Sequence, residues 1–169
     1  EMCIRDRSIS VGVKKEDYDV LKSIKREVLT VNYITIDIAH GHSHSMIEMI
    51  KFIRDSFPHV FIIAGNVATP DGFTDLCKAG ADAVKVGIGQ GAACTTKLQT
   101  GFTMPMFTCL QKIREERGYI FKEHRAVIIA DGGIKYNGDI AKAIVARADW
   151  VMSGKLFAEC KDSPAKSDE

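Results

Sequence analysis

The sequence lacks the features that would tie it to a membrane, a nucleic acid or an oxidising compartment. No apolar run approaches the roughly 20 residues that a transmembrane helix requires, and 23 basic against 22 acidic residues leave a formal net charge of only +1. That balance favours neither a nucleic-acid surface nor a membrane surface. The five cysteines are odd in number, scattered and free of any Cys-x-x-Cys pair, which disfavours a disulfide framework and a structural zinc site. We therefore expect a cytoplasmic protein that binds neither nucleic acid nor membrane.

The remaining composition is that of one ordinary globular domain. Of the 169 residues, 46% are hydrophobic and 27% are charged, and a chain of this length can bury a sizeable core. Residues 1–7 carry neither a helix nor a strand period and no signal-peptide core, so we interpret them as a non-native leader. We expect the domain itself over residues 8–164, followed by a polar tail at 165–169.

Six short apolar runs, rich in β-branched residues, predict buried strands of a parallel sheet. Amphipathic helices are expected between them: Pro70 after Thr69 predicts where the third helix begins, and Gly80 where it ends. Helical spacing puts Val28 on the buried face of the first helix and Phe107 on that of the fourth. This alternation indicates an α/β fold with right-handed crossovers. The expected strands are 9–13, 33–38, 60–64, 83–86, 126–130 and 150–152, and the expected helices are 16–28, 45–57, 70–79, 104–117 and 139–145.

Glycine and polar residues gather after the expected strands, at their carboxyl ends. Open α/β sheets and barrels both keep their binding sites at that end. Six strands cannot close an eight-stranded barrel, so the fold is either an open sheet or a barrel from which two βα units are missing. The clusters are residues 37–43, 65–66, 87–96, 131–133 and 153–154.

The loop after the fourth expected strand carries the clearest chemistry. Gly87, Gly89 and Gly91 alternate ahead of Cys94 and Thr96, and alternating glycines let the backbone approach a ligand or ion closely. A thiol that follows such a turn can attack an electrophilic carbon, and a hydroxyl two residues later can move a proton. The alternative is that Cys94 is a small buried hydrophobic residue, which is the commoner fate of a free cysteine.

The same loop also matches the pattern Gly-x-Gly-x-x-Ala, with Gly87, Gly89 and Ala92. That pattern can mark a dinucleotide-binding fold. Here it follows the fourth strand rather than the first, and no apolar helix begins after it. The position of the pattern in the chain therefore argues against a Rossmann fold.

A second set of glycines suggests a phosphate site. Asp131-Gly132-Gly133 follows one expected strand and Gly154-Lys155 follows the next. Backbone amides beside glycine can cradle an oxyanion, Lys155 could add charge, and Asp131 could accept from ribose hydroxyls. Asn66, at the end of another strand, is a candidate substrate contact. A simple tight turn explains each of these residues equally well.

Three histidines, His40, His42 and His44, invite a metal-site interpretation because imidazoles bind zinc well. The other two, His59 and His124, precede expected strands and therefore belong to the opposite face. A metal-dependent hydrolase would need further ligands at other strand ends. We favour a polar active-site loop that leads into a helix.

Seven blocks, read in order, resemble the IMP dehydrogenase/GMP reductase family from about Ser8 to Pro164. The resemblance implies a (β/α)8 TIM barrel that is incomplete, with strands 3–8 present and strands 1–2 missing. The blocks are residues 34–43, 64–69, 84–89, 94–97, 129–134, 138–142 and 151–158.

Within that family, the segment Asp37-Ile38-Ala39-His40-Gly41-His42-Ser43 is similar to bacterial reductases. The resemblance then implies NADPH-dependent reductive deamination of GMP to IMP and ammonia, through a covalent thioimidate on Cys94. The alternatives are an IMP dehydrogenase, which converts IMP to XMP with NAD, and a nucleotide-binding relative without activity. A phosphate-binding barrel that uses flavin is a further alternative, and it would not need Cys94.

The resemblance also implies roles for individual residues. Cys94 and Thr96 would be catalytic, the purine nucleotide (GMP or IMP) would be the partner, and the complete protein would be a homotetramer. Backbone carbonyls of Gly89, Gly91 and Cys94 would bind a potassium ion. The substrate residues would be Asn66, Asp131, Gly132, Gly133, Gly154 and Lys155, and the cofactor residues would be Asp37, Ile38, Ala39, Ile88 and Gly89.

Several positions depart from the pattern of the family. Gln90 and Ala92 stand where the loop usually has proline and serine, and Lys155 stands where serine or glycine is usual. The segment Thr103-Met104-Pro105-Met106-Phe107 replaces a glycine-rich stretch that is usual in reductases. The family's mobile flap would follow the last strand of this chain, so we expect the chain to be inactive by itself.

Overall fold

The computed structural model of the chain describes residues 7–92, 94–120 and 126–163, the side chains of residues 117–120 excepted. Its centre is one six-stranded sheet in which all neighbours are parallel and the spatial order is the chain order. The strands are β1 (Ser8–Val11), β2 (Tyr33–Asp37), β3 (Phe61–Val67), β4 (Ala83–Val86), β5 (Val127–Asp131) and β6 (Trp150–Met152). The helices are α1 (Lys15–Arg26), α2 (His44–Ser56), α3 (Pro70–Ala79), α4 (Thr96–Thr100), α5 (Met106–Ile120), α6 (Asn137–Val145) and α7 (Gly154–Ala158).

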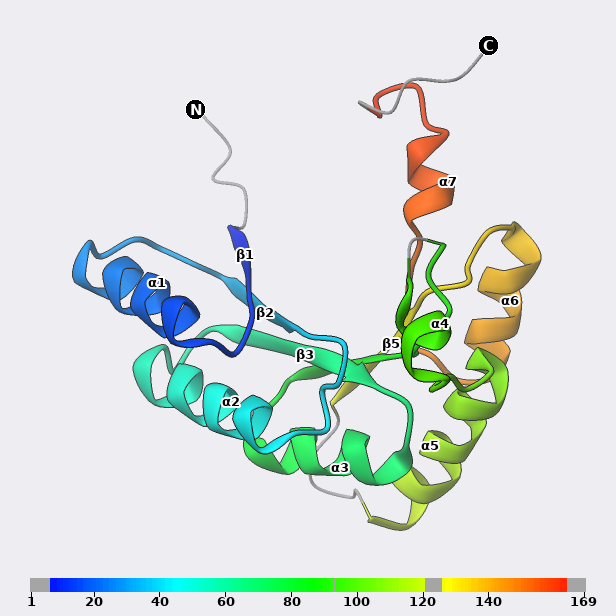
Figure 1. Ribbon diagram of the computed structural model, residues 1–169, viewed down its shortest axis with the longest axis horizontal. Helices are drawn as coiled ribbons and strands as arrows, with labels where there is room; N and C mark the ends of the chain where they lie inside the picture. The colour runs from blue at the N-terminus through cyan, green and yellow to red at the C-terminus, as the bar shows by residue number, and fades with distance from the viewer. Residues whose placement is uncertain (1–6, 93, 121–125, 164–169) are drawn as a thin grey trace.

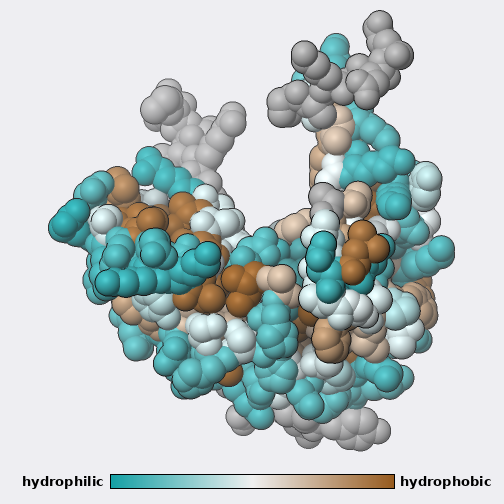
Figure 2. All heavy atoms as spheres, viewed as in Figure 1, coloured by the Kyte–Doolittle hydropathy of each residue, from teal (hydrophilic) through white to brown (hydrophobic). Residues whose placement is uncertain are grey.

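The sequential strand order makes this sheet part of a barrel wall. When every crossover has the same hand and the strand order never reverses, all connecting helices lie on one face of the sheet. Figure 1 shows α1, α2, α3, α5 and α6 along the outside of a curved sheet. Figure 2 shows the molecule hollowed between the arm that carries α1 and the arm that carries α7. The predicted α/β class is confirmed, and the sheet is that of a partial TIM barrel.

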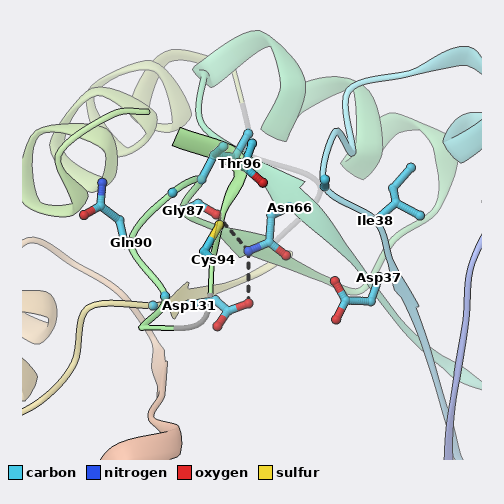
Figure 3. Close-up of a pocket in the computed structure, with 13 residues that line it drawn as sticks. Asp37, Ile38, Asn66, Gly87, Gln90, Cys94, Thr96 and Asp131 are labelled. Carbon is cyan, nitrogen blue, oxygen red and sulfur yellow. Dashed lines mark hydrogen bonds between the residues drawn. The ribbon is translucent and has the colours of Figure 1, made fainter. Parts of the chain in front are cut away.

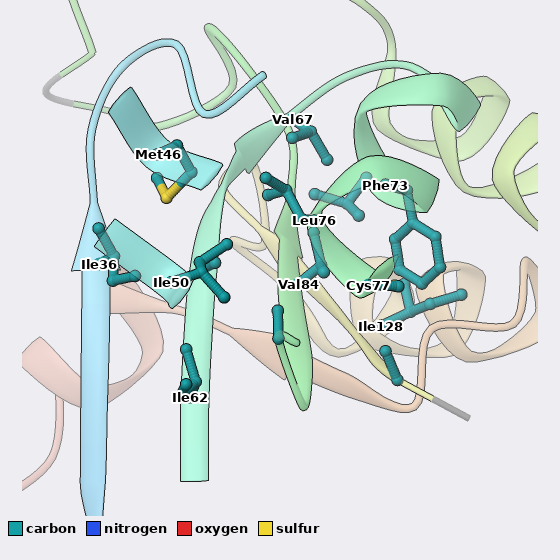
Figure 4. Packing of buried hydrophobic residues seen from close by; sticks show 14 of the residues in the cluster. Ile36, Met46, Ile50, Ile62, Val67, Phe73, Leu76, Cys77, Val84 and Ile128 are labelled. Carbon is teal, nitrogen blue, oxygen red and sulfur yellow. The ribbon is translucent and has the colours of Figure 1, made fainter. Parts of the chain in front are cut away.

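The hydrophobic core lies between the sheet and the outer helices (Figure 4). Ile36, Ile62 and Val84 from three successive strands are fully buried, as are Ile50 of α2 and Leu76 of α3. Burying one such aliphatic side chain stabilises the fold by about 1.5–3 kcal/mol. All four residues of β4 are buried, whereas β1 and β6 at the two sides of the sheet are largely exposed. The central strands are therefore the ones with enough packing to hold a site rigidly.

Helices α2 and α3 begin where their capping residues predict. The Ser43 hydroxyl accepts from the Met46 amide, and the Thr69 hydroxyl accepts from the Gly72 amide. These bonds satisfy amide groups that have no partner inside the helix. Gly80, with φ of 113°, ends α3 in the left-handed conformation that glycine adopts without strain. The predicted limits of α3 are confirmed.

Two predictions about helix faces are wrong. Helix α1 ends at Arg26, and Val28 follows it with φ of 56° and a side chain that is 87% exposed. Phe107 of α5 is 41% exposed, because α5 begins at Met106 and Phe107 lies in its first turn. The helical spacing fits both residues, but Val28 lies beyond the last residue of α1 and Phe107 is only the second residue of α5. Helical spacing alone does not predict burial at such end positions.

Strand β3 and the two shortest helices also differ from prediction. β3 runs on through Gly65 and Asn66 to Val67, with a register shift against β4 between Gly65 and Val67, so Gly65 and Asn66 belong to the strand and not to a loop after it. The helices α4 and α7 were not predicted, since five residues are too few to show a helical period. None of the helices in the described ranges has the length and hydropathy to cross a membrane.

An arginine cluster ties the elements together at the amino ends of the strands. The Arg54 guanidinium donates to the carbonyls of Pro58, Val60 and Gly80 and to the carboxylate of Asp82. That carboxylate also accepts from the Ile62 amide over 2.7 Å. The cluster joins α2, β3 and the turn before β4, on the side of the sheet away from the glycine loops.

Candidate functional site

A pocket of about 290 Å3 opens at the carboxyl ends of β2 to β5 (Figure 3). Parallel strands bring their carboxyl ends to one rim, so loops that are far apart in the sequence meet there. The pocket collects most of the residues that the sequence singled out. Its lining consists of Asp37, Ile38, Ala39, Asn66, Gly87, Ile88, Gly89, Gln90, Gly91, Cys94, Thr96, Asp131 and Gly132.

Cys94 is the nucleophile candidate of this pocket. The Thr96 side chain and backbone amide both hydrogen-bond to its sulfur and lower the pKa of the thiol. Burial opposes these two effects more weakly, and the Gly89 backbone and the positive charge of Lys97 add still smaller contributions that lower the pKa. A lowered pKa raises the fraction of thiolate, which is the reactive form of cysteine. Cys94 is half-buried and not a packed core residue, so the simple hydrophobic interpretation does not describe it.

Helix α4 places Thr96 next to Cys94. Thr96 is the first residue of α4, and the Cys94 amide donates to the Gly91 carbonyl over 3.1 Å. This hydrogen bond closes a turn from Gly91 to Cys94, which keeps the thiol next to the glycine loop that follows β4. A hydroxyl this close to the sulfur is in position to supply or accept a proton during attack and departure.

A buried lysine joins two aspartates at the base of the pocket. Lys85 of β4 is 3% exposed, and its Nζ lies 2.9 Å from Asp37 Oδ2 and 3.1 Å from Asp131 Oδ2. Asp37 ends β2 and Asp131 ends β5. One ammonium group thus holds two carboxylates from strands on either side of β3 and β4. Sequence reasoning missed Lys85, although a single charge inside a four-residue apolar strand was the signal for it.

Asn66 links the same cluster to the glycine loop. Its Nδ2 donates to the Gly87 carbonyl over 2.8 Å and to Asp131 Oδ2 over 3.0 Å. Its Oδ1 is buried, and within the described part of the chain it has no hydrogen-bond partner. An unpaired acceptor beneath a pocket is costly unless a ligand donates to it. The substrate role of Asn66 therefore stays a prediction, and its buried unpaired Oδ1 atom favours that prediction.

A second, larger cavity of about 580 Å3 adjoins the first one. The two share the lining residues Ala39, Ile88 and Thr96, so they lie side by side. The walls of the second cavity are mainly apolar, with Val67, Ala68, Phe102 and Met104 among them. Such walls suit a flat ring of a ligand or cofactor. Of the five predicted cofactor residues, Ala39 and Ile88 line both cavities, and Asp37, Ile38 and Gly89 line the first one.

Three of the predicted substrate residues lie outside the Cys94 pocket. Gly133 lines a smaller cavity of about 100 Å3, together with Asp139 and Lys142, and this cavity meets the Cys94 pocket only at Gly132. Gly154 and Lys155 form the first turn of α7, where Lys155 Nζ lies 3.7 Å from Glu159 and 5.1 Å from the centre of the Tyr136 ring. They are absent from the linings of the three cavities given above, so their substrate role stays a prediction.

The potassium ligands predicted from the resemblance lie on one short loop. Carbonyl oxygens suit a hard cation, and Gly89 has a left-handed φ of 84° that turns the chain there. The Gly91 carbonyl accepts from the Cys94 amide and keeps a second lone pair. The donor set therefore fits such an ion, with further oxygens needed to complete its coordination.

The histidines of the loop before α2 do not converge. His42 Nε2 lies 3.0 Å from Asp75 of α3, and His44 Nε2 lies 3.3 Å from Glu48 of α2. No group of three or more potential metal ligands occurs among the residues that the structure describes. The polar-loop interpretation agrees with these pairings, and His124 lies outside the described residues.

Comparison with known proteins gives the chain its family. The IMP dehydrogenase / GMP reductase domain matches residues 7–168. A protein named GMP reductase from Oenococcus oeni is 51% identical over 157 residues, which are 93% of this chain and 47% of that protein. GMP reductases from Lactobacillus gasseri and Staphylococcus aureus strain JH9 are each 49% identical, over 93% and 96% of this chain and 46% and 48% of their own lengths. This chain thus spans about half the length of the curated relatives it matches, and it belongs to the IMP dehydrogenase/GMP reductase family.

Proposed function

We propose that the protein to which this chain belongs is a GMP reductase, which converts GMP to IMP and ammonia with NADPH. The observation that carries the proposal is the position of Cys94. A thiol with a lowered pKa lies in a pocket whose polar groups include the Asp37 and Asp131 carboxylates, the unpaired amide oxygen of Asn66 and the backbone of the glycine loop. That combination suits a nucleotide whose base is attacked while its ribose is held. The names of the similar proteins agree with it.

Cys94 performs the covalent step of the proposed reaction. Its thiolate bonds to C2 of the guanine ring, and the amino group on C2 departs as ammonia after taking up a proton. Thr96, which contacts the sulfur, moves that proton at the departing nitrogen. The product of this step is a thioimidate between the purine and Cys94. When hydrogen has been added at C2, the C2–S bond breaks, Cys94 returns to the thiolate and IMP is released.

Asp131 and Asn66 orient the nucleotide in this proposal. Asp131 accepts from the ribose hydroxyls, while Lys85 and the Asn66 amide keep its carboxylate in place. The Asn66 Oδ1 atom accepts from the ligand, which gives this buried oxygen the donor that it otherwise lacks. Gly132 offers backbone amide surface to the phosphate side, with Gly133, Gly154 and Lys155 beyond it.

NADPH, when bound, supplies the hydride that takes the place of the amino group. Ala39, Ile88 and Gly89, with Asp37 and Ile38 beside them, would hold the cofactor where the two cavities meet. The carbonyls of Gly89, Gly91 and Cys94 would hold a potassium ion, whose charge would stabilise the loop that carries the thiol. We further propose that β1–β6 are the third to eighth strands of a closed (β/α)8 barrel and that the complete enzyme is a cytoplasmic homotetramer.

A chimeric enzyme tests the proposal with the residues of this chain in place. Residues 8–164 replace the matching segment of the O. oeni relative, which is 51% identical to this chain over 157 residues. With GMP, we expect the chimera to oxidise NADPH and to release IMP and ammonia in equal amounts. Cys94→Ala should abolish this turnover and leave GMP binding intact.

Other outcomes identify the alternatives. Oxidation of IMP to XMP with NAD, without turnover of GMP, would assign the chain to the dehydrogenase branch. Binding of GMP or IMP without any turnover would support a relative that has lost activity through Gln90 and Ala92. A Cys94→Ala chimera that retained full activity would exclude covalent catalysis altogether.

A further inference from the structure

Gln90, which stands where the family usually has proline, makes two side-chain hydrogen bonds across the site. Its Nε2 donates to Thr103 Oγ1 over 3.0 Å and to the Met104 carbonyl over 2.7 Å. A carbonyl oxygen only accepts, so the atom of Gln90 that contacts it is the amide nitrogen. Both amide protons of Gln90 are thereby used. They connect the glycine loop after β4 to the segment between α4 and α5.

Thr103 passes this connection back to the loop. Because its oxygen accepts from Gln90, its own proton is available to the Ile88 carbonyl, which lies 3.0 Å away. Hydrogen bonds in such a series strengthen one another. The series runs from the Gln90 amide, through the Thr103 hydroxyl, to the peptide group between Ile88 and Gly89.

The peptide group at the end of this series lies in the lining of the pocket that also holds Cys94. Its carbonyl belongs to Ile88 and is held by Thr103, and its N–H belongs to Gly89, whose backbone is one of the groups that lower the pKa of Cys94. A peptide is planar, so fixing its carbonyl also fixes the direction of its N–H. A Cβ on Gly89 would lie 2.8 Å from Thr103 Oγ1, so only glycine lets Thr103 approach this closely.

The other side of Gln90 packs against the turn that follows β5. A Cβ on Gly132 would lie 3.1 Å from Gln90 Cβ and 2.9 Å from the Gly91 amide. On Gly133 it would lie 3.4 Å from Gln90 Cβ. Gln90 is thus held between two neighbouring loops, and its amide can reach a third segment without leaving that position.

Gln90 and the segment of residues 103–107, which both depart from the family pattern, are therefore in contact with each other. Proline fixes its own φ but offers no side-chain donor, whereas Gln90 fixes the loop through bonds to Thr103 and Met104. Those two residues belong to the segment that replaces the usual glycine-rich stretch. The segment supplies the hydroxyl and the carbonyl that accept hydrogen bonds from Gln90.

We propose that Gln90 and Thr103 are a pair of positioning residues that hold the Ile88–Gly89 peptide against Cys94. The pair fixes the loop by side-chain hydrogen bonds and not by a proline ring. This role rests on the proposed function of Cys94, but the clamp itself is a property of the free chain. It can therefore be measured without any nucleotide.

Amide hydrogen exchange over residues 87–91 tests the clamp. We expect Thr103→Val, which keeps the shape and removes the hydroxyl, to speed exchange there by roughly fivefold, the effect of one lost hydrogen bond. Thr103→Ser should restore the slow exchange, because it keeps the hydroxyl. Gln90→Ala should match Thr103→Val, and the double variant should add little, since both changes break one series.

Residues 33–37 of β2 serve as the internal reference for this experiment. Exchange that rises equally in β2 would mean general destabilisation and would overturn the local role. Additive effects of the two changes, or failure of Thr103→Ser to restore protection, would overturn it as well. Gln90→Ala alters a half-buried loop side chain, so it tests the clamp even if Thr103→Val fails to fold.

The chimeric enzyme separates the clamp from the proposed function. There we expect Thr103→Val to lower kcat by roughly fivefold and to change the KM for GMP little, because Asn66 and Asp131 are untouched. Faster exchange with an unchanged kcat would overturn the positioning role. A chimera that never turns over GMP would instead overturn the proposed function, and the exchange results would still decide whether the clamp exists.

Discussion

The two ends of the sheet hold similar charged clusters that differ in how completely they are bonded. At the amino end, Arg54 donates to three carbonyls and to Asp82, and Asp82 also accepts a backbone amide. At the carboxyl end, Lys85 holds Asp37 and Asp131, yet Asp37 is 55% exposed and the Asn66 Oδ1 atom is buried without a partner among the described residues.

This difference separates a cluster that serves the fold from one that serves a ligand. The Arg54 cluster closes on itself, because its groups take their partners from the backbone around it. The Lys85 cluster faces a pocket and leaves acceptor capacity open toward it. Native proteins seldom leave buried polar atoms unpaired, so the unpaired Asn66 Oδ1 atom beneath the pocket favours the proposal that a ligand binds at this end of the sheet.

Arg54→Ala should break the amino-end cluster and give the largest loss of stability among these variants. It removes four hydrogen bonds and leaves Asp82 without its counter-charge. We expect the free energy of unfolding to fall by about 3 kcal/mol, measured by urea denaturation. Lys51→Ala, at an exposed position of the same helix, is the matched control and should change stability by less than about 0.5 kcal/mol.

Because the Arg54 cluster lies at the amino end of the sheet, we expect Arg54 to take no part in nucleotide binding. In the chimeric enzyme, Arg54→Ala should leave kcat/KM per folded molecule unchanged, because the cluster lies at the end of the strands away from Cys94. A large fall in kcat/KM at temperatures where the variant is folded would mean that the amino end also shapes the site. The proposed division between the two ends would then be wrong.

Lys85→Met should cost less stability and more activity. Water reaches Asp37 and, less fully, Asp131, whose side chains are 55% and 22% exposed, so their lost counter-charge is partly compensated. We expect a loss of about 1–2 kcal/mol in the free energy of unfolding, below that of a fully buried pair. Because Asp131 loses its fixed position, kcat/KM of the chimera should fall at least roughly tenfold.

Lys85→Arg is the control that keeps the charge at this position. It should retain more activity than Lys85→Met, even though a guanidinium does not reproduce the shape of an ammonium group. Equal activity in the two variants would indicate that the charge of Lys85 does not matter. Activity that tracks stability in both would make Lys85 a structural residue like Arg54.

The carboxyl end also marks the limit of what the sequence could predict. Strands, helices and the loop of Cys94 follow from periodicity and glycine placement, which are local, and the limits of β4, α3 and β6 were predicted correctly. The pairing of Lys85 with two aspartates depends on the strand order and register. No local pattern contains that information, so sequence reasoning missed Lys85.

Errors at element ends have a similar cause. Val28 fits the period of α1, but Glu27 already ends the helix, and Val28 turns outward with positive φ. Asn66 was predicted to follow its strand, either as a substrate contact or as a turn residue, whereas β3 continues through it. The predicted substrate residues are divided among the Cys94 pocket, the cavity lined by Gly133, and helix α7. This division depends on the three-dimensional arrangement of the last strands and helices, which no local sequence pattern contains.

Cys109 and Cys94 extend the comparison from charges to thiols. Burial in the core raises the pKa of Cys109 to about 11 from an ordinary value of 9.0, with Lys112 opposing the shift slightly. The unfolded chain therefore releases this proton near pH 9.0, while the folded chain keeps it until about pH 11. This contribution to stability is complete below pH 9.0 and is lost as the pH rises through that window.

Cys109→Ala should remove this pH dependence. We expect the stability difference between the native chain and the variant to shrink by about 1–2 kcal/mol from the lower to the upper end of the window. Chemical denaturation at several pH values measures it, and titration of lysines and tyrosines cancels in the difference. A difference that stays constant with pH would show that the core does not favour the protonated thiol.

Thr96→Val should produce the smallest effect, at the end of the sheet that stays open to a ligand. The Thr96 side chain makes the largest contribution to the lowered pKa of Cys94, so its loss should move the midpoint of Cys94 alkylation upward, toward 9.0. At neutral pH the alkylation rate should then fall a few-fold, whereas Thr96→Ser, which keeps the hydroxyl, should hold it. Cys160, exposed and remote from the pocket, provides the reference rate in the same molecule. Equal rates in the Val and Ser variants would mean that the backbone alone prepares the thiol, and the distinction between the two ends would then rest on Lys85 and Asn66 rather than on Cys94.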